Sequence, residues 1–135
     1  MRYKKKLSFA IHLADEIREY IVPKLILQPL VENAIYHGIK GKEQGGTIVI
    51  DCMKRDGFVV LCVEDDGLGM PQEKQRKIQR MLSEGVVEDN ESYGLTNVNE
   101  RLKLFFGEKY TMSVESTEGK GTKVSIEIRE ESMHV

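Results

Sequence analysis

The sequence predicts an α+β fold, a two-layer α/β sandwich in which one mixed five-stranded sheet is covered on one face by three helices. Five segments alternate apolar and polar residues with period two, the pattern of strands that are buried on one face only. Three other segments carry apolar residues at helical spacing, and they supply the layer that such a sheet needs. Because no repeat or linker divides residues 1–135, we expect a single domain.

The first expected strand covers residues 7–13. Its apolar face is formed by alternate residues, Leu7, Phe9, Ile11 and Leu13. His12 lies on the opposite face, so we expect it to be a solvated strand residue. The same alternation predicts the last two strands, at residues 110–115 and 124–128.

The second and third strands, residues 47–54 and 58–65, flank Asp56-Gly57. This dipeptide supplies positive φ at both central positions of a two-residue turn, so the strands should pair antiparallel. Such a turn places three cross-strand pairs on one face: Ile48 with Asp65, Ile50 with Val63, and Cys52 with Leu61. Cys62 then points away from Cys52, and we expect no disulfide within the chain.

Turn and cap residues bound the three expected helices. The first begins near Pro29 and stops at Gly38. The second lies between Pro71 and about Leu82, with an apolar stripe of Ile78, Met81 and Leu82. The third opens around Gly94 and ends before Gly107; its expected stripe is Leu95, Val98, Leu102, Phe105 and Phe106. Residues 83–92 are polar and acidic apart from one valine pair, which predicts a mobile loop.

Composition excludes several classes of function. Twenty basic and 22 acidic side chains leave a formal net charge of -2, so no overall cationic field favours nucleic acid or a lipid surface. The sequence has no apolar stretch long enough to span a membrane. Cys52 and Cys62 have no second cysteine pair and no histidine at ligand spacing, which argues against a zinc site and fits a reducing cytoplasm.

Four short motifs carry the candidate chemistry. Asn33 and His37 lie one helical turn apart in QPLVENAIYHG. In EDDGLGM, Asp65 ends a strand on the helix-facing side, where a carboxylate needs a donor such as the exocyclic amine of adenine. SYGLTN opens a helix and so directs free N–H groups toward an anion such as a phosphate. GKGT precedes the last strand. Taken singly, these motifs also fit a surface polar pair, a turn with a solvated aspartate, a helix cap and a hairpin turn.

Taken together and in order, the motifs resemble the catalytic and ATP-binding domain of sensor histidine kinases, which shares the Bergerat-type fold of the GHKL (HATPase_c) class with gyrase-type and heat-shock chaperone ATPases. LQPLVENAIYHG, VEDDGLGM, YGLTNVNERL and GKGTKVSIEI are similar to the LytS and YesM type of bacterial kinase. The resemblance covers about residues 25–128. It implies that residues 1–24 hold the first strand and the tail of a connection to dimerisation helices.

The resemblance implies a role for residues of the first two motifs. Asn33 matches the asparagine whose amide oxygen coordinates the Mg²⁺ that bridges the ATP phosphates, which makes it the expected metal ligand and catalytic residue. His37 matches a position that approaches the nucleotide. Asp65 matches the aspartate that recognises the adenine amino group, and Gly67 and Gly69 match the glycines that follow it.

The resemblance also assigns the last two motifs to ATP. Gly94, Leu95 and Asn97 match the segment that closes a lid over the phosphates. Thr122 matches a residue that helps to hold the base.

Two positions depart from related patterns, and a third, carboxylate-bearing position lies close to the site. Tyr36 stands where many histidine kinases have lysine, so a phosphate contact is lost or taken over. Pro29 stands where gyrase-like ATPases have a water-activating glutamate, so we expect slow hydrolysis. Glu32 points about 100° away from Asn33 around the helix, which leaves it at most a supporting role.

The phosphoacceptor of the family is a histidine in a preceding helix, and His12, His37 and His134 do not match its context. We therefore expect the cytoplasmic catalytic domain of a larger membrane-bound sensor, itself not inserted in the membrane. It would position Mg-ATP for γ-phosphoryl transfer to a histidine on a separate dimerisation domain, with a response regulator downstream. Two alternatives stay open: a non-catalytic nucleotide-sensing module, which the Tyr36 departure would fit, and a free-standing serine kinase regulator of the same fold.

Overall fold

The structure is a computed structural model, and it describes residues 7–13, 26–35, 45–85 and 93–133. The elements of these ranges are, in chain order, β1 (Leu7–Leu13), α1 (Gln28–Asn33), β2 (Gly46–Arg55), β3 (Phe58–Asp65), α2 (Gln72–Glu84), α3 (Tyr93–Phe106), β4 (Tyr110–Thr117), β5 (Gly121–Arg129) and the short 3-10 helix η4 (Glu130–Met133). No helix among the described residues is long and apolar enough to cross a membrane.

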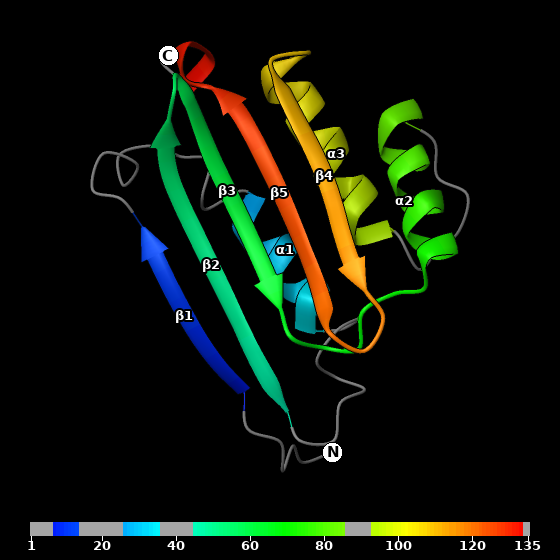
Figure 1. The fold of residues 1–135 in the computed structure, drawn as a ribbon. Helices are drawn as coiled ribbons and strands as arrows, with labels where there is room; N and C mark the ends of the chain where they lie inside the picture. Colours follow the sequence, from blue (N-terminus) through cyan, green and yellow to red (C-terminus); the bar gives the residue numbers. More distant parts are fainter. Residues whose placement is uncertain (1–6, 14–25, 36–44, 86–92, 134–135) are drawn as a thin grey trace.

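The strands form one five-stranded sheet in the order β1-β2-β3-β5-β4 (Figure 1). β1 runs parallel to β2, and the other three neighbouring pairs are antiparallel. The predicted mixed sheet is confirmed. Three strands meet at the lower end of Figure 1, where β3 ends, β5 begins and β4 ends.

The β2–β3 hairpin has the predicted turn and register. Asp56 and Gly57 both have positive φ, at 52° and 83°. Ile48 pairs with Asp65, Ile50 with Val63 and Cys52 with Leu61, as predicted. Cys52 is buried on the helix-facing side, whereas Cys62 lies on the opposite face, and both are free thiols. His12 is 67% exposed, as expected, and its Nδ1 lies 2.8 Å from Asp51 Oδ1 across the β1–β2 pair.

The described helix bounds differ from expectation at the end of α2. α1 is helical from Gln28, with Pro29 in its first turn, and its predicted stop at Gly38 lies outside the described residues. α2 continues to Glu84, past the expected end near Leu82, and stops at Gly85, whose φ is 72°. The expected loop therefore begins later than predicted, and its residues 86–92 are not described.

The apolar stripe of α3 was predicted correctly except at one position. Leu95, Val98, Leu102 and Phe106 are buried, but Phe105 is 56% exposed. Phe105 lies about 100° around the helix from Phe106, which already completes the core-facing stripe. Its expected burial was therefore wrong. On α2, the predicted stripe of Ile78, Met81 and Leu82 is buried.

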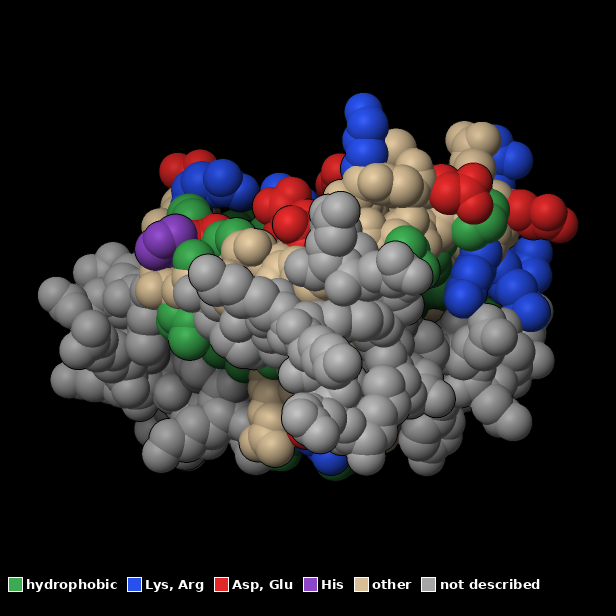
Figure 2. All heavy atoms as spheres, turned by 90° about the horizontal axis from the view of Figure 1, so that it is seen from below, with side chains coloured by type: hydrophobic (Ala, Val, Ile, Leu, Met, Phe, Trp, Pro, Cys, Tyr) green, Lys and Arg blue, Asp and Glu red, His purple; other side chains and the backbone are tan. Residues whose placement is uncertain are grey.

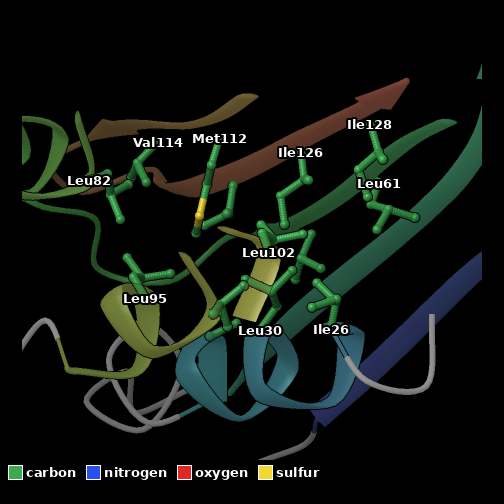
Figure 3. Packing of buried hydrophobic residues seen from close by; sticks show 14 of the residues in the cluster. Ile26, Leu30, Leu61, Leu82, Leu95, Leu102, Met112, Val114, Ile126 and Ile128 are labelled. Atoms are coloured by element: carbon green, nitrogen blue, oxygen red, sulfur yellow. The ribbon is translucent and has the colours of Figure 1, made fainter. Parts of the chain in front are cut away.

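The core lies between the sheet and the helices. Figure 3 shows side chains of α1 and α3 directed toward those of the strands, with Leu30 and Leu102 facing Ile126. Two side chains at the start of α1 are almost fully buried: Ile26, just before the helix, and Leu30, in its first turn. This anchoring fixes the position of Asn33, which ends the same helix.

α2 lies beside β4 (Figure 1). Two glutamines of α2 form hydrogen bonds with the outer edge of that strand. Val114 N donates to Gln79 Oε1 at 3.1 Å, and Ser116 N donates to Gln75 Oε1 at 3.2 Å. The two amide nitrogens donate in return to the carbonyls of Met112 and Val114. Glutamines four positions apart on a helix rise about 6 Å, close to the spacing of alternate strand residues, so both reach edge groups at once.

Candidate functional site

Asp65, the last residue of β3, forms the centre of the candidate site. It is 6% exposed and pairs with Ile48 of β2 and Thr122 of β5. Its Oδ1 accepts a hydrogen bond from the backbone N–H of Gly67 at 2.9 Å. Burial raises the pKa of the Asp65 carboxyl, and hydrogen bonds from the backbone N–H groups of Gly67 and Thr122 offset part of this rise. The carboxylate is thus held in place by its own turn and still has unused acceptor capacity.

Two glycines let the turn after β3 pack onto the β4–β5 hairpin. A β-carbon at Gly69 would overlap the carbonyl of Thr117, and one at Gly121 would overlap the carbonyl of Asp65. Both glycines also have positive φ, at 70° and 132°. Close backbone packing therefore explains the need for glycine at these positions, and the expected ligand contact of Gly69 stays a prediction.

Ser116 of β4 is a site residue that the motif analysis missed. Its Oγ lies 2.9 Å from three groups: the backbone N of Met70, the backbone O of Gly121, and Oγ1 of Thr122. The alternation of β4 contained the only sequence signal for it. Ser116 continues the inward-facing series of Met112 and Val114, where an apolar residue would be expected.

Asn33 and Gly94, from the first and third motifs, lie next to each other. A β-carbon at Gly94 would be 3.1 Å from Asn33 Oδ1 and 3.7 Å from its Cβ. The glycine therefore leaves the amide oxygen uncrowded at the first turn of α3. In Figure 1, the last turn of α1 and the first turn of α3 point toward the end of the sheet where β3 ends.

The other residues of the third motif differ in environment. Leu95 is 3% exposed and belongs to the core, so it anchors the first turn of α3. Asn97 is half-buried. Asn99, which was not predicted, is buried; its Nδ2 donates to Leu82 O at 3.0 Å, and its Oδ1 accepts from Tyr110 OH at 2.7 Å. Asn99 thereby joins α3 to the last part of α2.

Some predicted features lie outside the described residues, namely His37, Tyr36, His134 and positions 86–92 of the expected lid. Within the described part, Glu32 is exposed and accepts a hydrogen bond from Gln28 Nε2 at 3.1 Å, one turn back on α1. Pro29 occupies the first turn of the same helix.

The described side chains of the candidate site fit Mg²⁺ only together with a bound ligand that supplies further oxygen atoms. No group of three or more His, Cys, Asp or Glu side chains suited to a metal occurs among the residues that the structure describes. Mg²⁺ prefers oxygen ligands and retains waters, so a single amide oxygen such as that of Asn33 suffices only where phosphate oxygens supply further ligands.

Figure 2 views the molecule from the end of the sheet that carries Asp65. Acidic and basic side chains are interspersed over the described part of this face. The described part of the face therefore has no continuous field of one sign, and selectivity for a ligand must come from individual groups.

Comparisons with known proteins give relatives and a shared fold. The chain is 35% identical over 127 residues to the sensor histidine kinase YesM of Bacillus subtilis, covering 94% of this chain and 20% of YesM. It is 34% identical over 119 residues to the sensor histidine kinase/phosphatase LytS of Staphylococcus aureus, covering 86% of this chain and 20% of LytS. The chain thus spans about a fifth of the length of these relatives.

A solved structure has the same fold. The histidine kinase domain of a blue-light activated histidine kinase from Erythrobacter litoralis matches with a TM-score of 0.64 and 18% identity, covering 94% of this chain and 53% of that one. The model of one family, described as histidine kinase-, DNA gyrase B-, and HSP90-like ATPase, matches residues 20–132. These residues include all four motifs and every element from α1 to β5. The chain belongs to the family of histidine kinase-, DNA gyrase B- and HSP90-like ATPases.

Proposed function

We propose that this chain is the ATP-binding catalytic domain of a two-component sensor histidine kinase. It positions Mg-ATP for transfer of the γ-phosphoryl group to a histidine on a separate dimerisation domain. The observation that carries the proposal is the juxtaposition of Asn33 with Gly94 at the first turn of α3, at the same end of the sheet as the buried Asp65. An acceptor for a base and a helix start for phosphates are the two recognition elements that a nucleotide needs.

Each group of the chain has a defined task in this proposal. When bound, Mg-ATP supplies the phosphoryl group and the charge-neutralising cation. Asp65 accepts a hydrogen bond from the amino group of the base, with Gly67 and Thr122 beside it. The free N–H groups at Gly94 and Leu95, in the first turn of α3, favour the phosphates, and Asn97 lies in the turn that follows. The Asn33 amide oxygen would serve as a ligand for Mg²⁺. His37 completes the proposed set.

The described residues also favour transfer over hydrolysis. Pro29 has no side-chain base, and Glu32 is engaged by Gln28 one turn back on the helix. A water molecule near the phosphates would therefore lack a carboxylate from α1 to activate it. The attacking group is instead an imidazole supplied by another domain, and this domain contributes position and electrostatics.

The remaining assignments concern the parent protein. Both relatives are about five times longer than the aligned part, and both are named as sensor kinases. We propose that residues 1–135 form one domain, with residues 1–24 holding β1 and the connection to the dimerisation helices. The parent would be a membrane-bound sensor that presents this domain to the cytoplasm and passes the phosphoryl group to a response regulator.

The test is reconstitution of phosphoryl transfer from two separate domains. The purified domain is mixed with the dimerisation domain of its parent at high concentration, which replaces the missing tether, and with γ-labelled ATP. We expect label on a histidine of the added domain, acid-labile and base-stable, and none on this domain alone. Asn33→Ala should abolish the transfer, whereas Gln72→Ala, an exposed amide-to-alanine change on α2, should retain it.

Two other outcomes would redirect the assignment. Rapid ATP turnover by the isolated domain would indicate an ATPase. ATP binding without transfer to the added domain would favour the nucleotide-sensing module, for which the replacement of lysine by Tyr36 is the supporting observation.

A further inference from the structure

We propose that Ser116 fixes the direction of the Thr122 hydroxyl, so that the Thr122 oxygen meets the nucleobase only as a hydrogen-bond acceptor. Ser116 is then a positioning residue that sets selectivity for a base with an amino group over one with a carbonyl at the same place. The inference rests on the proposed ATP site and extends it to a residue outside the four motifs.

The proton count around Ser116 determines the direction. Its hydroxyl has one proton and two acceptor positions. The backbone N–H of Met70 can only donate, and the carbonyl of Gly121 can only accept, so the single Ser116 proton goes to Gly121. The 2.9 Å contact between Ser116 Oγ and Thr122 Oγ1 must therefore use the proton of Thr122. The reverse direction would leave two oxygen atoms of Ser116 and Gly121 at 2.9 Å without a proton between them.

This arrangement commits the only hydroxyl proton of Thr122. What Thr122 Oγ1 has left is acceptor capacity alone. Ser116, Thr122 and Asp65 are direct partners on three neighbouring strands, in the order β4, β5, β3, and so share the helix-facing side of the sheet. An ionised Asp65 is likewise an acceptor only. Thr122 and Asp65 therefore offer only acceptors to a ligand. They match an amino group, whereas they would repel a carbonyl oxygen.

Backbone groups hold this arrangement in place. The N–H of Ser116 donates to Gln75 Oε1 at 3.2 Å, which fixes the edge strand from outside. Gly121 has a φ of 132° and packs its Cα against the Asp65 carbonyl, so the direction of its own carbonyl is constrained. Because both fixed partners of Ser116 are main-chain atoms, the direction of the Thr122 hydroxyl is set before any ligand binds.

The test compares calorimetric affinities for ATP and for inosine triphosphate, which differ by an amino group against a carbonyl at position 6 of the purine. Ser116→Ala frees the Thr122 hydroxyl to rotate and donate. We expect the ratio of ATP affinity to inosine triphosphate affinity to fall about 3- to 10-fold, the effect of roughly one neutral hydrogen bond. Ser116→Thr, which retains a hydroxyl, should preserve the ratio. Ser113→Ala, an exposed serine on the other face of β4, should also leave it unchanged.

A double-variant cycle separates positioning from simple support of the fold. Thr122→Val should lower the same ratio, and adding Ser116→Ala to it should cause no further fall, because the serine acts through Thr122. If Ser116→Ala folds poorly, Ser116→Cys provides a variant of similar size with a weak donor. If Ser116→Ala leaves the ratio unchanged, whether or not both affinities fall equally, the inference is overturned while the ATP site stays intact. A wild-type domain that binds neither nucleotide would overturn the proposed function and this inference with it.

Discussion

At the scale of single residues, Asp65 is placed where stability and binding oppose each other. Its carboxyl lies at the buried end of β3, where removal from water disfavours the ionised form. The ionised form is the one that best accepts a hydrogen bond from the amino group of a ligand. Two backbone N–H groups compensate only in part, since its pKa remains raised above the ordinary value of 3.8. The ionised form of Asp65 is therefore disfavoured at the position where the base is proposed to bind.

The pH dependence of stability tests this conflict. A carboxyl whose pKa is raised by folding stabilises the fold below its unfolded pKa, and this contribution is lost as the pH rises through the folded pKa. The free energy of unfolding of the wild type should therefore fall relative to that of Asp65→Asn as the pH is raised from acid to neutral. ATP affinity should change in the opposite direction, because ionised Asp65 is the better acceptor. Urea unfolding and calorimetry at a series of pH values measure both.

Glu64→Gln supplies the control for this comparison. Glu64 precedes Asp65 but is exposed on the opposite face of the sheet. Its replacement should produce a much smaller pH-dependent difference. A difference between the wild type and Asp65→Asn that does not vary with pH would contradict the assigned environment of Asp65.

Residues differ in how far the sequence alone could place them. Asp65 was predictable because the Asp56-Gly57 turn determines the register of β2 and β3, and period two then decides the face. Ser116 was not, since its role depends on Met70 and Gly121, which approach it only when two turns pack together. Phe105 was misplaced because two adjacent phenylalanines both fit a broad apolar stripe, and packing selects only one.

At the scale of elements, the two edge strands of the sheet differ in what their outer polar groups bond to. β1 ends the sheet on one side, and on the other the polar groups of β4 are bonded to Gln75 and Gln79 of α2. The helical pattern of α2 predicted its buried stripe but not this use of its amides. Glutamines on a helix are commonly solvated, and only the placement of α2 beside the edge strand makes them partners of the backbone.

Removing one of these amides should destabilise the domain. Gln79→Ala leaves the N–H of Val114 and the carbonyl of Met112 without their side-chain partner. We expect a loss of about 1 kcal/mol, since water at this edge replaces part of the interaction. Urea unfolding measures the loss, and hydrogen exchange at Val114 should become faster. Gln72→Ala, an exposed change in the first turn of α2, should affect neither quantity. Equal behaviour of the two variants would show that the hydrogen bonds between Gln79 and β4 do not stabilise the domain.

At the scale of the whole molecule, the proposed site is assembled from segments distant in the chain. α1 contributes Asn33, the end of β3 contributes Asp65, α3 contributes Gly94 and β5 contributes Thr122. The order of the motifs was sufficient to predict the family, and the period-two alternation predicted the sheet. The contacts between motifs, such as Asn33 with Gly94, could not be derived from order alone, because they depend on how α1 and α3 pack on the shared core.

A ligand that joins these segments should stabilise the molecule as a unit. Binding to the folded state alone adds about 2.7 kcal/mol to the free energy of unfolding at a ligand concentration of 100 times Kd. For a domain of 135 residues this corresponds to a rise in Tm of about 10 °C. We expect this rise in Tm with Mg-ATP and a smaller rise with ATP and a chelator. Replacing ATP by inosine triphosphate should reduce the rise in Tm further. Thermal unfolding followed by circular dichroism measures each.

Asn33→Ala should remove the magnesium-dependent part of this stabilisation and leave the part that ATP supplies without the metal. The reason is that its amide oxygen is the proposed protein ligand of the cation, whereas the base contacts lie on the sheet. Gln72→Ala, an exposed amide-to-alanine change on α2, should behave like the wild type. If Asn33→Ala retains the full difference between Mg-ATP and chelated ATP, the cation is held by other groups, and the assignment of Asn33 as the metal ligand is wrong even though the nucleotide binds.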